Sequence, residues 1–269
     1  MPLIILIMLF GAAIFADLLP LHNPEIGNPR ERLMAPAWTE GGSLKYPLGT
    51  DTMGRDILAR LIYGARISLL VAFAAVFLSA IIGTTLGVWA GFIGGWIEQV
   101  IMRIMDAWLS IPSIMFAILM SVILGQGIFN IIIIMTLLYW PRYARLTRGE
   151  ALGLKTRDFV HLATIAGCGK IIIMFRHILP NVMNTVITFA SLQVGAVIVV
   201  EASLTFLGVG VPTPKPAWGL MLSEGKGGLF TGQWWLIVFP GIAIAMLVMS
   251  FNLIGDWLRR RLDPHTQNL

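Results

Sequence analysis

Long runs of residues without a charged side chain dominate this sequence and restrict the folds that it can adopt. Residues 67–97 and 107–141 contain no Asp, Glu, Lys or Arg. A helix needs about 20 mostly apolar residues to cross a hydrocarbon core about 30 Å thick. In the whole chain, 57% of residues are hydrophobic and only 12% are charged, unlike a water-soluble domain. The sequence therefore predicts an all-α membrane protein.

Six candidate spans follow from these runs. The segment Pro2–Ala16 is short, and an N-terminal anchor fits it better than a signal peptide, because no basic residue precedes it. The Gly125-Gln126-Gly127 break divides 107–141 into two spans, with a kink expected at Pro112. The remaining spans are expected within 67–97, at Val182–Leu207 and at Trp235–Trp257.

We expect two parts in the chain. Residues 1–66 would form the anchor, an external loop and an interfacial helix over 56–66, and residues 67–269 would form a five-helix core with a polar loop at 149–181. Within the second span, Gly83, Gly87 and Gly91 recur every four residues. Such a stripe of small residues predicts close approach of another helix.

The basic balance of the chain, +5 at pH 7, is typical of loops that flank membrane spans and does not indicate nucleic-acid binding. If the segment 158–181 is cytosolic, the inner loops carry a small excess of Lys and Arg, which weakly favours cytosolic N and C termini. Arg60 and Arg66 then fall on the outer side, where we expect their long side chains to reach water from the interfacial helix.

The segment 158–181 lies between strongly apolar runs and predicts two short helices. Its first helix would begin near Asp158 and end at Gly167-Cys168-Gly169. The apolar face at helical spacing comprises Phe159, Leu162, Ala163 and Ala166. Such a helix could fit a groove on another protein, and an ordinary amphipathic surface helix explains the pattern equally well.

The same residues resemble the E-A-A-x3-G-x9-I-x-L-P signature of permease subunits of ABC importers. Ala163, Gly167, Leu179 and Pro180 stand at the expected spacing, whereas His161-Leu162 replaces Glu-Ala and His177 replaces Ile. Residues 46–71 resemble the signature of the peptide/nickel subfamily in its C-type subunit. Further agreement lies at Arg103–Asp106, Glu201–Gly208, Trp218-Gly219 and Asn252–Asp256.

This resemblance implies a type I ABC importer (MetI-like) permease fold with six transmembrane helices. It implies half of a translocation pathway for di- or oligopeptides in a bacterial inner membrane, with 149–181 as the coupling loop. The implied partners are a second permease, two ATPase subunits, an extracytoplasmic substrate-binding protein and the lipid bilayer. ATP and Mg²⁺ would be held by the ATPases, since this chain lacks the G-x-x-x-x-G-K-[ST] phosphate loop. The implied ATPase-coupling residues are Phe159, His161, Leu162, Ala163, Ala166, Gly167, Leu179 and Pro180.

Glu201 is the only charged residue between 182 and 214. A carboxylate at that depth costs a few kcal/mol unless it is paired or faces water. Glu201 could therefore line the pathway or a gate, or it could be the structural partner of a group on a neighbouring helix. Glu224 is expected in a wet external loop, where its removal should matter less.

Turn-forming and charged residues alternate just before the interfacial helix, and they predict a folded external cap. The cap residues are Gly49, Thr50, Asp51, Gly54, Arg55 and Asp56. Ion pairs among Asp51, Arg55 and Asp56 would hold it. A catalytic role is not expected, because no nucleophile or base stands beside these residues.

Other functions make different demands on the sequence. A secondary transporter would show inverted repeats and paired charges within the spans, and a membrane enzyme would need a cluster of catalytic groups there. The single Cys168 and the scattered histidines offer no metal-ligand spacing. Within the importer class, nickel chelates, glutathione or another small solute are alternatives to peptides. Members of the subfamily usually carry a basic segment before the first span, and its absence here would fit a start codon placed too far downstream.

Overall fold

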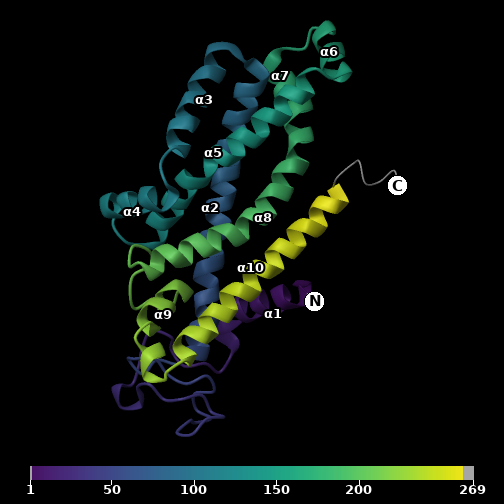
Figure 1. Cartoon of the computed structure of the whole chain (residues 1–269). Coiled ribbons are helices and arrows are strands. Elements are labelled where there is room, and N and C mark those ends of the chain that lie inside the picture. Colours follow the sequence, from purple (N-terminus) through teal and green to yellow (C-terminus); the bar gives the residue numbers. More distant parts are fainter. Residues whose placement is uncertain (1, 263–269) are drawn as a thin grey trace. The chain divides into compact units, whose positions relative to one another are not determined.

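The computed structural model describes residues 2–262, and the predicted cytosolic position of the C-terminus falls outside them. The described part is helical, and it has no β-strand beyond an isolated bridge between Thr50 and Asp56. This confirms the all-α prediction. The helices are α1 (Pro2–Ile14), α2 (Ile57–Ile93), α3 (Gly95–Leu109), α4 (Ser113–Leu124), α5 (Ile128–Lys155), α6 (Asp158–Ile165), α7 (Lys170–Ile173), α8 (Leu179–Phe206), α9 (Trp218–Gly225) and α10 (Trp235–Leu262) (Figure 1).

Three of the described helices are long and apolar enough to cross a membrane by themselves: Ile57–Ile93, Lys170–Phe206 and Trp235–Arg261. A fourth crossing is possible if α3 and α4, which are bent by 91°, act together. Helix α1 has only 13 residues. The C-terminal half of α5 carries Arg142, Arg145 and Arg148, which lower its hydropathy. The count of six spans therefore stays a prediction.

The expected interfacial helix at 56–66 is not a separate element, because α2 runs without interruption from Ile57 to Ile93. Of the two arginines that were expected to reach water, Arg60 is buried, whereas the Arg66 side chain is 33% exposed and pairs with Asp17. Arg60 is 1% exposed, and the Arg66 guanidinium donates to the backbone carbonyls of Ala13 and Ile14 at the end of α1. The snorkelling expected of Arg60 is therefore wrong, and the interfacial position of the first turns of α2 stays a prediction.

The breaks expected in the run 107–141 are present. The chain leaves the helix at Ser110–Pro112, between α3 and α4, where a kink at Pro112 was expected. It breaks again between α4 and α5, where Gly125 and Gly127 have positive φ angles of 79° and 151°. Glycine reaches such angles without the steric cost that a side chain imposes.

The described chain forms two units. Unit 1 contains the residues up to Phe73 together with Ile118–Ile132 and Val194–Ile254, and unit 2 contains Ala74–Ala117, Ile133–Gln193 and the residues from Gly255. Each unit has an apolar cluster of its own. The members are Val211, Ala217, Leu220, Ile67 and Ile128 in unit 1, and Met105, Trp140, Ala144, Leu86, Ile101 and Met102 in unit 2.

The glycine stripe of α2 lies against α5 in unit 2, as predicted. A Cβ atom on Gly83 would lie 2.4 Å from the Trp140 carbonyl oxygen, and one on Gly87 would lie 2.1 Å from Thr147 Oγ1. A Cβ on Gly91 would lie 2.6 Å from the Arg148 carbonyl oxygen. No side chain fits at these distances, so the two helices pack backbone against backbone.

Replacing Gly87 by Ala should destabilise the protein by about 1–3 kcal/mol, because the added methyl group forces α2 and α5 apart. Thr147 cannot easily turn away, since its hydroxyl donates to the Tyr143 carbonyl oxygen at 2.9 Å. The matched control is Gly153→Ala in α5, where a Cβ meets no atom within 4 Å. Thermal unfolding of the purified variants in detergent measures both effects, and equal midpoints for the two variants would contradict this packing.

Candidate functional site

Helix α6 in unit 2 is the predicted coupling helix, and it begins and ends close to the expected residues. It spans Asp158–Ile165 and ends where Gly167 takes a φ of 79°. The Gly167 and Cys168 amides donate to the carbonyl oxygens of Thr164 and Ala163, both at 3.0 Å. Two of the last carbonyls of the helix are thereby satisfied, and the chain can turn toward α7.

The apolar face of α6 differs in part from the predicted one. Ala163 is buried together with Val160, whereas Phe159 and Leu162 are exposed and Ala166 lies on the exposed end of the segment. The side chains of Phe159, Leu162 and Ile165 form an exposed apolar ridge, with exposed fractions of 37%, 66% and 83%. We call these residues the α6 ridge. Ile165 was missed, although its spacing of three residues from Leu162 could have revealed it.

The second half of the signature lies in one continuous helix. Residues 170–206 form a single apolar helix, and its stretch Met174–Ile178 has π-helical geometry. Pro180 is the second residue of α8, directly after the π-helical stretch, and the helix continues through it without a break. Among the other signature residues, His161 is exposed, Leu179 is partly buried, and the His177 ring lies 6.3 Å from the Phe159 ring. Exposed Ile171, Ile172 and Phe175 extend the apolar surface of this segment.

The predicted cap in unit 1 is a folded turn before α2. Gly49 and Gly54 have φ angles of 84° and 77°, and a Cβ on either would lie within 2.4 Å of a backbone carbonyl oxygen. Asp51 Oδ1 accepts the amides of Met53 and Arg55 at 2.8 and 3.0 Å, which closes the turn. The Thr50 hydroxyl donates to the Glu31 carbonyl oxygen at 2.5 Å. The cap thus holds the polar loop that precedes α2.

The two carboxylates predicted for the cap, Asp51 and Asp56, both have side-chain partners. Arg55 Nε lies 2.6 Å from Asp51 Oδ2, as expected. Asp56 is instead paired with His22 at 3.0 Å, and its Oδ1 atom accepts the Leu58 amide at 2.9 Å at the start of α2. The carboxylate therefore caps the helix, which satisfies one of its free N–H groups.

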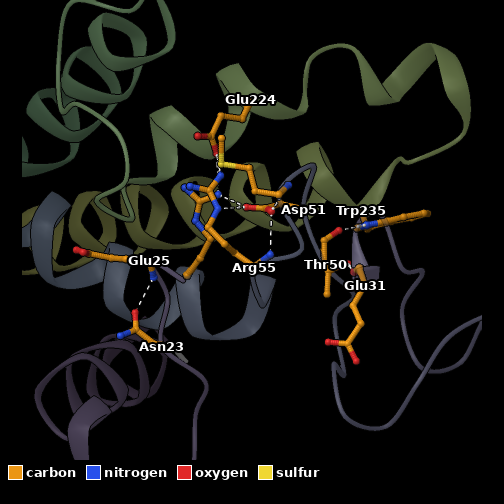
Figure 2. A network of polar contacts seen from close by, with 10 residues as sticks. Asn23, Glu25, Glu31, Thr50, Asp51, Arg55, Glu224 and Trp235 are labelled. Carbon is orange, nitrogen blue, oxygen red and sulfur yellow. Dashed lines mark hydrogen bonds and ion pairs between the residues drawn. The ribbon is translucent and has the colours of Figure 1, made fainter. Parts of the chain in front are cut away.

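Glu224 and Arg60 do not lie in water, contrary to what their positions in the sequence predict. Glu224 does not lie free in a wet loop: its side chain is 18% exposed, and its Oε2 atom accepts from Arg55 Nη2 and Arg60 Nη1 at 2.7 Å each. Arg60 also pairs with Asp51. Figure 2 shows Asp51, Arg55 and Glu224 converging from the cap and from α9. We call Asp51, Arg55, Arg60 and Glu224 the ion cluster.

Glu201 is fully buried inside unit 1, at 0% exposure. Its carboxylate accepts from the Ser68 hydroxyl of α2 at 3.2 Å and from the Thr205 hydroxyl at 2.9 Å. The partners are therefore hydroxyl groups, one of them on the neighbouring helix α2. This geometry favours the structural role over a pathway-lining role, because the side chain has no surface open to solvent.

The neighbours of Glu201 come from other motifs that the sequence singled out. A Cβ on Gly219 would lie 2.4 Å from the Ala202 carbonyl oxygen, so α9 lies directly on α8. The Trp218 indole donates to the Leu61 carbonyl oxygen at 2.9 Å, and its ring covers Gly64 of α2. Segments that are far apart in the sequence thus meet at one place in unit 1.

Glu201→Ala should destabilise unit 1 by about 2 kcal/mol or more, because it leaves two buried hydroxyls without their acceptor and opens a cavity. Glu201→Gln should cost less, since the amide keeps the shape and can hydrogen-bond to both hydroxyls. Thermal unfolding and membrane accumulation of the two variants distinguish these outcomes. A loss of transport in Glu201→Gln with unchanged stability would instead favour a direct role of the charge in the pathway.

A second prediction concerns Glu31 in the polar loop of unit 1. Hydrogen bonds from Lys45 and then Tyr46 lower the pKa of Glu31 from 4.5 to about 2. A carboxyl whose pKa is lower in the folded state stabilises that state above its ordinary pKa and loses this contribution as the pH falls. We expect local amide exchange in residues 28–46, corrected for its intrinsic pH dependence, to rise between about pH 4.5 and 2. Glu31→Gln should flatten that rise, and an unchanged profile in this variant would contradict the assignment.

Comparison with known proteins agrees with the fold and the motifs. Residues 83–268 match the family of binding-protein-dependent transport system inner membrane components. The di/tripeptide transport system permease protein DppC of Pseudomonas aeruginosa is 39% identical over 266 residues, covering 99% of this chain and 88% of that protein. The glutathione transport system permease protein GsiD of Pectobacterium atrosepticum is 38% identical over 258 residues, covering 96% and 84%.

A solved structure of the MetNI methionine ABC transporter in inward-facing conformations contains a chain of similar fold. The TM-score is 0.62 at 19% identity, and the match covers 76% of this chain and 96% of that chain. The predicted MetI-like fold is thereby confirmed. With a family match over residues 83–268 and relatives aligned along nearly its whole length, this chain belongs to the family of binding-protein-dependent transport system inner membrane components.

Proposed function

We propose that this chain is the permease subunit of an ATP-driven ABC importer and forms half of a translocation pathway for di- or oligopeptides. The observation that carries the proposal is the 39% identity to a di/tripeptide permease over 99% of the chain. The apolar helices that can cross a membrane and the exposed α6 ridge support the same role. The other half of the pathway would come from a second, homologous permease.

Two ATPase subunits would bind ATP and Mg²⁺ and would receive α6 in a groove. The α6 ridge supports this proposal, because an exposed apolar stripe on a short helix is the feature that helix-in-groove recognition uses. Ala163 and Gly167 are not part of the exposed surface that would dock. Ala163 packs inward, and Gly167 ends the helix. A charge at Ala163 would therefore damage the segment itself and would not report cleanly on a partner.

The proposed orientation places α6 and both termini in the cytosol of a bacterium and the cap with its polar loop on the outer side. A substrate-binding protein would deliver the solute there. Loading of the binding protein and binding of ATP would each favour one of two conformations of the permease pair, which couples the two events thermodynamically. The family description, an inner membrane component of binding-protein-dependent transport, supports this arrangement.

Glutathione is the second candidate solute. It is favoured by a specific observation, the 38% identity to a glutathione permease over 96% of this chain. Glutathione is itself a small peptide with free carboxylates, so one pathway could pass both kinds of solute. Selection between them would rest largely with the binding protein.

Leu162→Asp tests the docking role of α6. The Leu162 side chain is 66% exposed, so the substitution should leave the fold intact while placing an unpaired charge in the proposed ATPase groove. We expect ATPase recovered with the tagged permease in mild detergent to fall at least about tenfold, because buried apolar anchors dominate such interfaces. ATP-driven uptake should fall with it.

Leu44→Asp is the matched control, because Leu44 is 88% exposed in the polar loop on the other side of the proposed membrane. This variant should retain the ATPase. Full recovery of ATPase and full uptake with Leu162→Asp would show that α6 does not dock there.

A further inference from the structure

The ion cluster in unit 1 brings two guanidinium groups and two carboxylates together away from water. The side chains of Arg55 and Arg60 are each 1% exposed, and those of Asp51 and Glu224 are 7% and 18% exposed. The formal charges cancel. Buried charges are tolerated when they are paired and hydrogen-bonded in this way, and removal of one partner leaves a charge without compensation.

The two buried guanidinium groups carry more N–H groups than the cluster pairs. Asp51 Oδ2 and Glu224 Oε2 each accept from both arginines. Even so, Arg55 Nη1 and the Nε and Nη2 atoms of Arg60 have no hydrogen-bond partner among residues 2–262. Loss of Glu224 would therefore leave still more buried N–H groups unpaired and one positive charge in excess.

Little free space lies beside the ion cluster. A pocket beside it is lined by Asp51, Arg60, Glu224 and other residues of the cap and of α9, and it has room for about one water molecule. A peptide cannot enter such a space. The arginines are thus available for holding parts of the chain together and not for binding cargo.

Helix α9 contacts α2 at both of its ends. At its first residue, the Trp218 indole donates to the Leu61 carbonyl oxygen and covers Gly64. Next to its last residue, Glu224 holds Arg55 just before α2 and Arg60 in the first turn of α2. Two separated contacts fix the direction of α9 along α2, which a single contact could not do.

We propose that Glu224 is a positioning residue: through Arg55 and Arg60 it locks α9, the cap and the first turns of α2 into one body that moves as a unit during transport. The locking follows from the geometry of unit 1 alone. The statement about transport rests on the proposed function.

Hydrogen–deuterium exchange of the purified protein, read by mass spectrometry, tests the locking. In Glu224→Gln, exchange in residues 49–60 and in residues 218–225 should accelerate together, each by about tenfold or more, because both segments lose the same ion pairs. The control is Glu40→Gln, which alters an exposed carboxylate of the polar loop that has no ion pair within residues 2–262. Acceleration in one segment only, or in neither, would overturn the proposal.

The double variant Arg60→Gln/Glu224→Gln separates charge pairing from a general loss of packing. It removes one charge of each sign and leaves the Asp51–Arg55 pair neutral. We expect slower exchange in the double variant than in either single variant. The single variants Arg60→Gln and Glu224→Gln could fail to accumulate in the membrane. In that case the double variant should accumulate better than both, and accumulation no better than theirs would refute the pairing.

Uptake measurements on the same variants test whether transport requires α9, the cap and the first turns of α2 to move as one body. ATP-driven uptake by the complex should fall at least about fivefold in Glu224→Gln and recover in part in the double variant. Faster exchange with unchanged uptake would show that Glu224 holds α9 to the cap and to α2 but that transport does not depend on this connection. If no ATPase accompanies even the unmodified chain, the proposed function fails, whereas the exchange result still decides whether Glu224 locks α9.

Discussion

The backbone contact between α2 and α5 is the constraint on which unit 2 depends. Helices in lipid gain little from the hydrophobic effect, because lipid tails are as apolar as leucine side chains, so close packing and polar contacts must hold them together. The stripe at Gly83, Gly87 and Gly91 supplies that packing. Ion pairs between Arg148 and Glu98 and between Arg145 and Asp106 add polar contacts between α5 and α3.

Unit 1 is held by a different kind of contact, in which polar groups are buried against α9. Gly219 lets α9 lie on α8, the Trp218 indole fastens it to α2, and Glu224 joins it to the cap. Glu201 lies fully buried nearby with its two hydroxyl partners. Trp218 and Glu224 are bonded to residues distant in the sequence, as Glu201 is to Ser68. The contacts of Trp218 and Glu224 explain how a short helix between α8 and α10 obtains a fixed position.

The sequence predicted the features that depend on local spacing. The glycine stripe, the break at Gly125–Gly127, the short helix α6 and the Asp51–Arg55 pair all follow from residues close together in the chain, and the kink predicted at Pro112 is a full break between α3 and α4. The contacts of Arg60 and Glu224 could not be predicted in this way, because 164 residues separate the two and each alone looks like a solvated charge. The same holds for Glu201 and Ser68, which are separated by 133 residues, while Ile165 followed the helical spacing and was overlooked.

Uptake of a labelled dipeptide by the complex purified with this chain from its native membrane, and rebuilt in lipid vesicles, tests the central claim most directly. If the chain is an importer permease, accumulation of the dipeptide requires ATP, the accompanying ATPase and the loaded binding protein together. Transport by the chain alone, without ATP and driven only by an ion gradient, would contradict the account and would identify a secondary transporter.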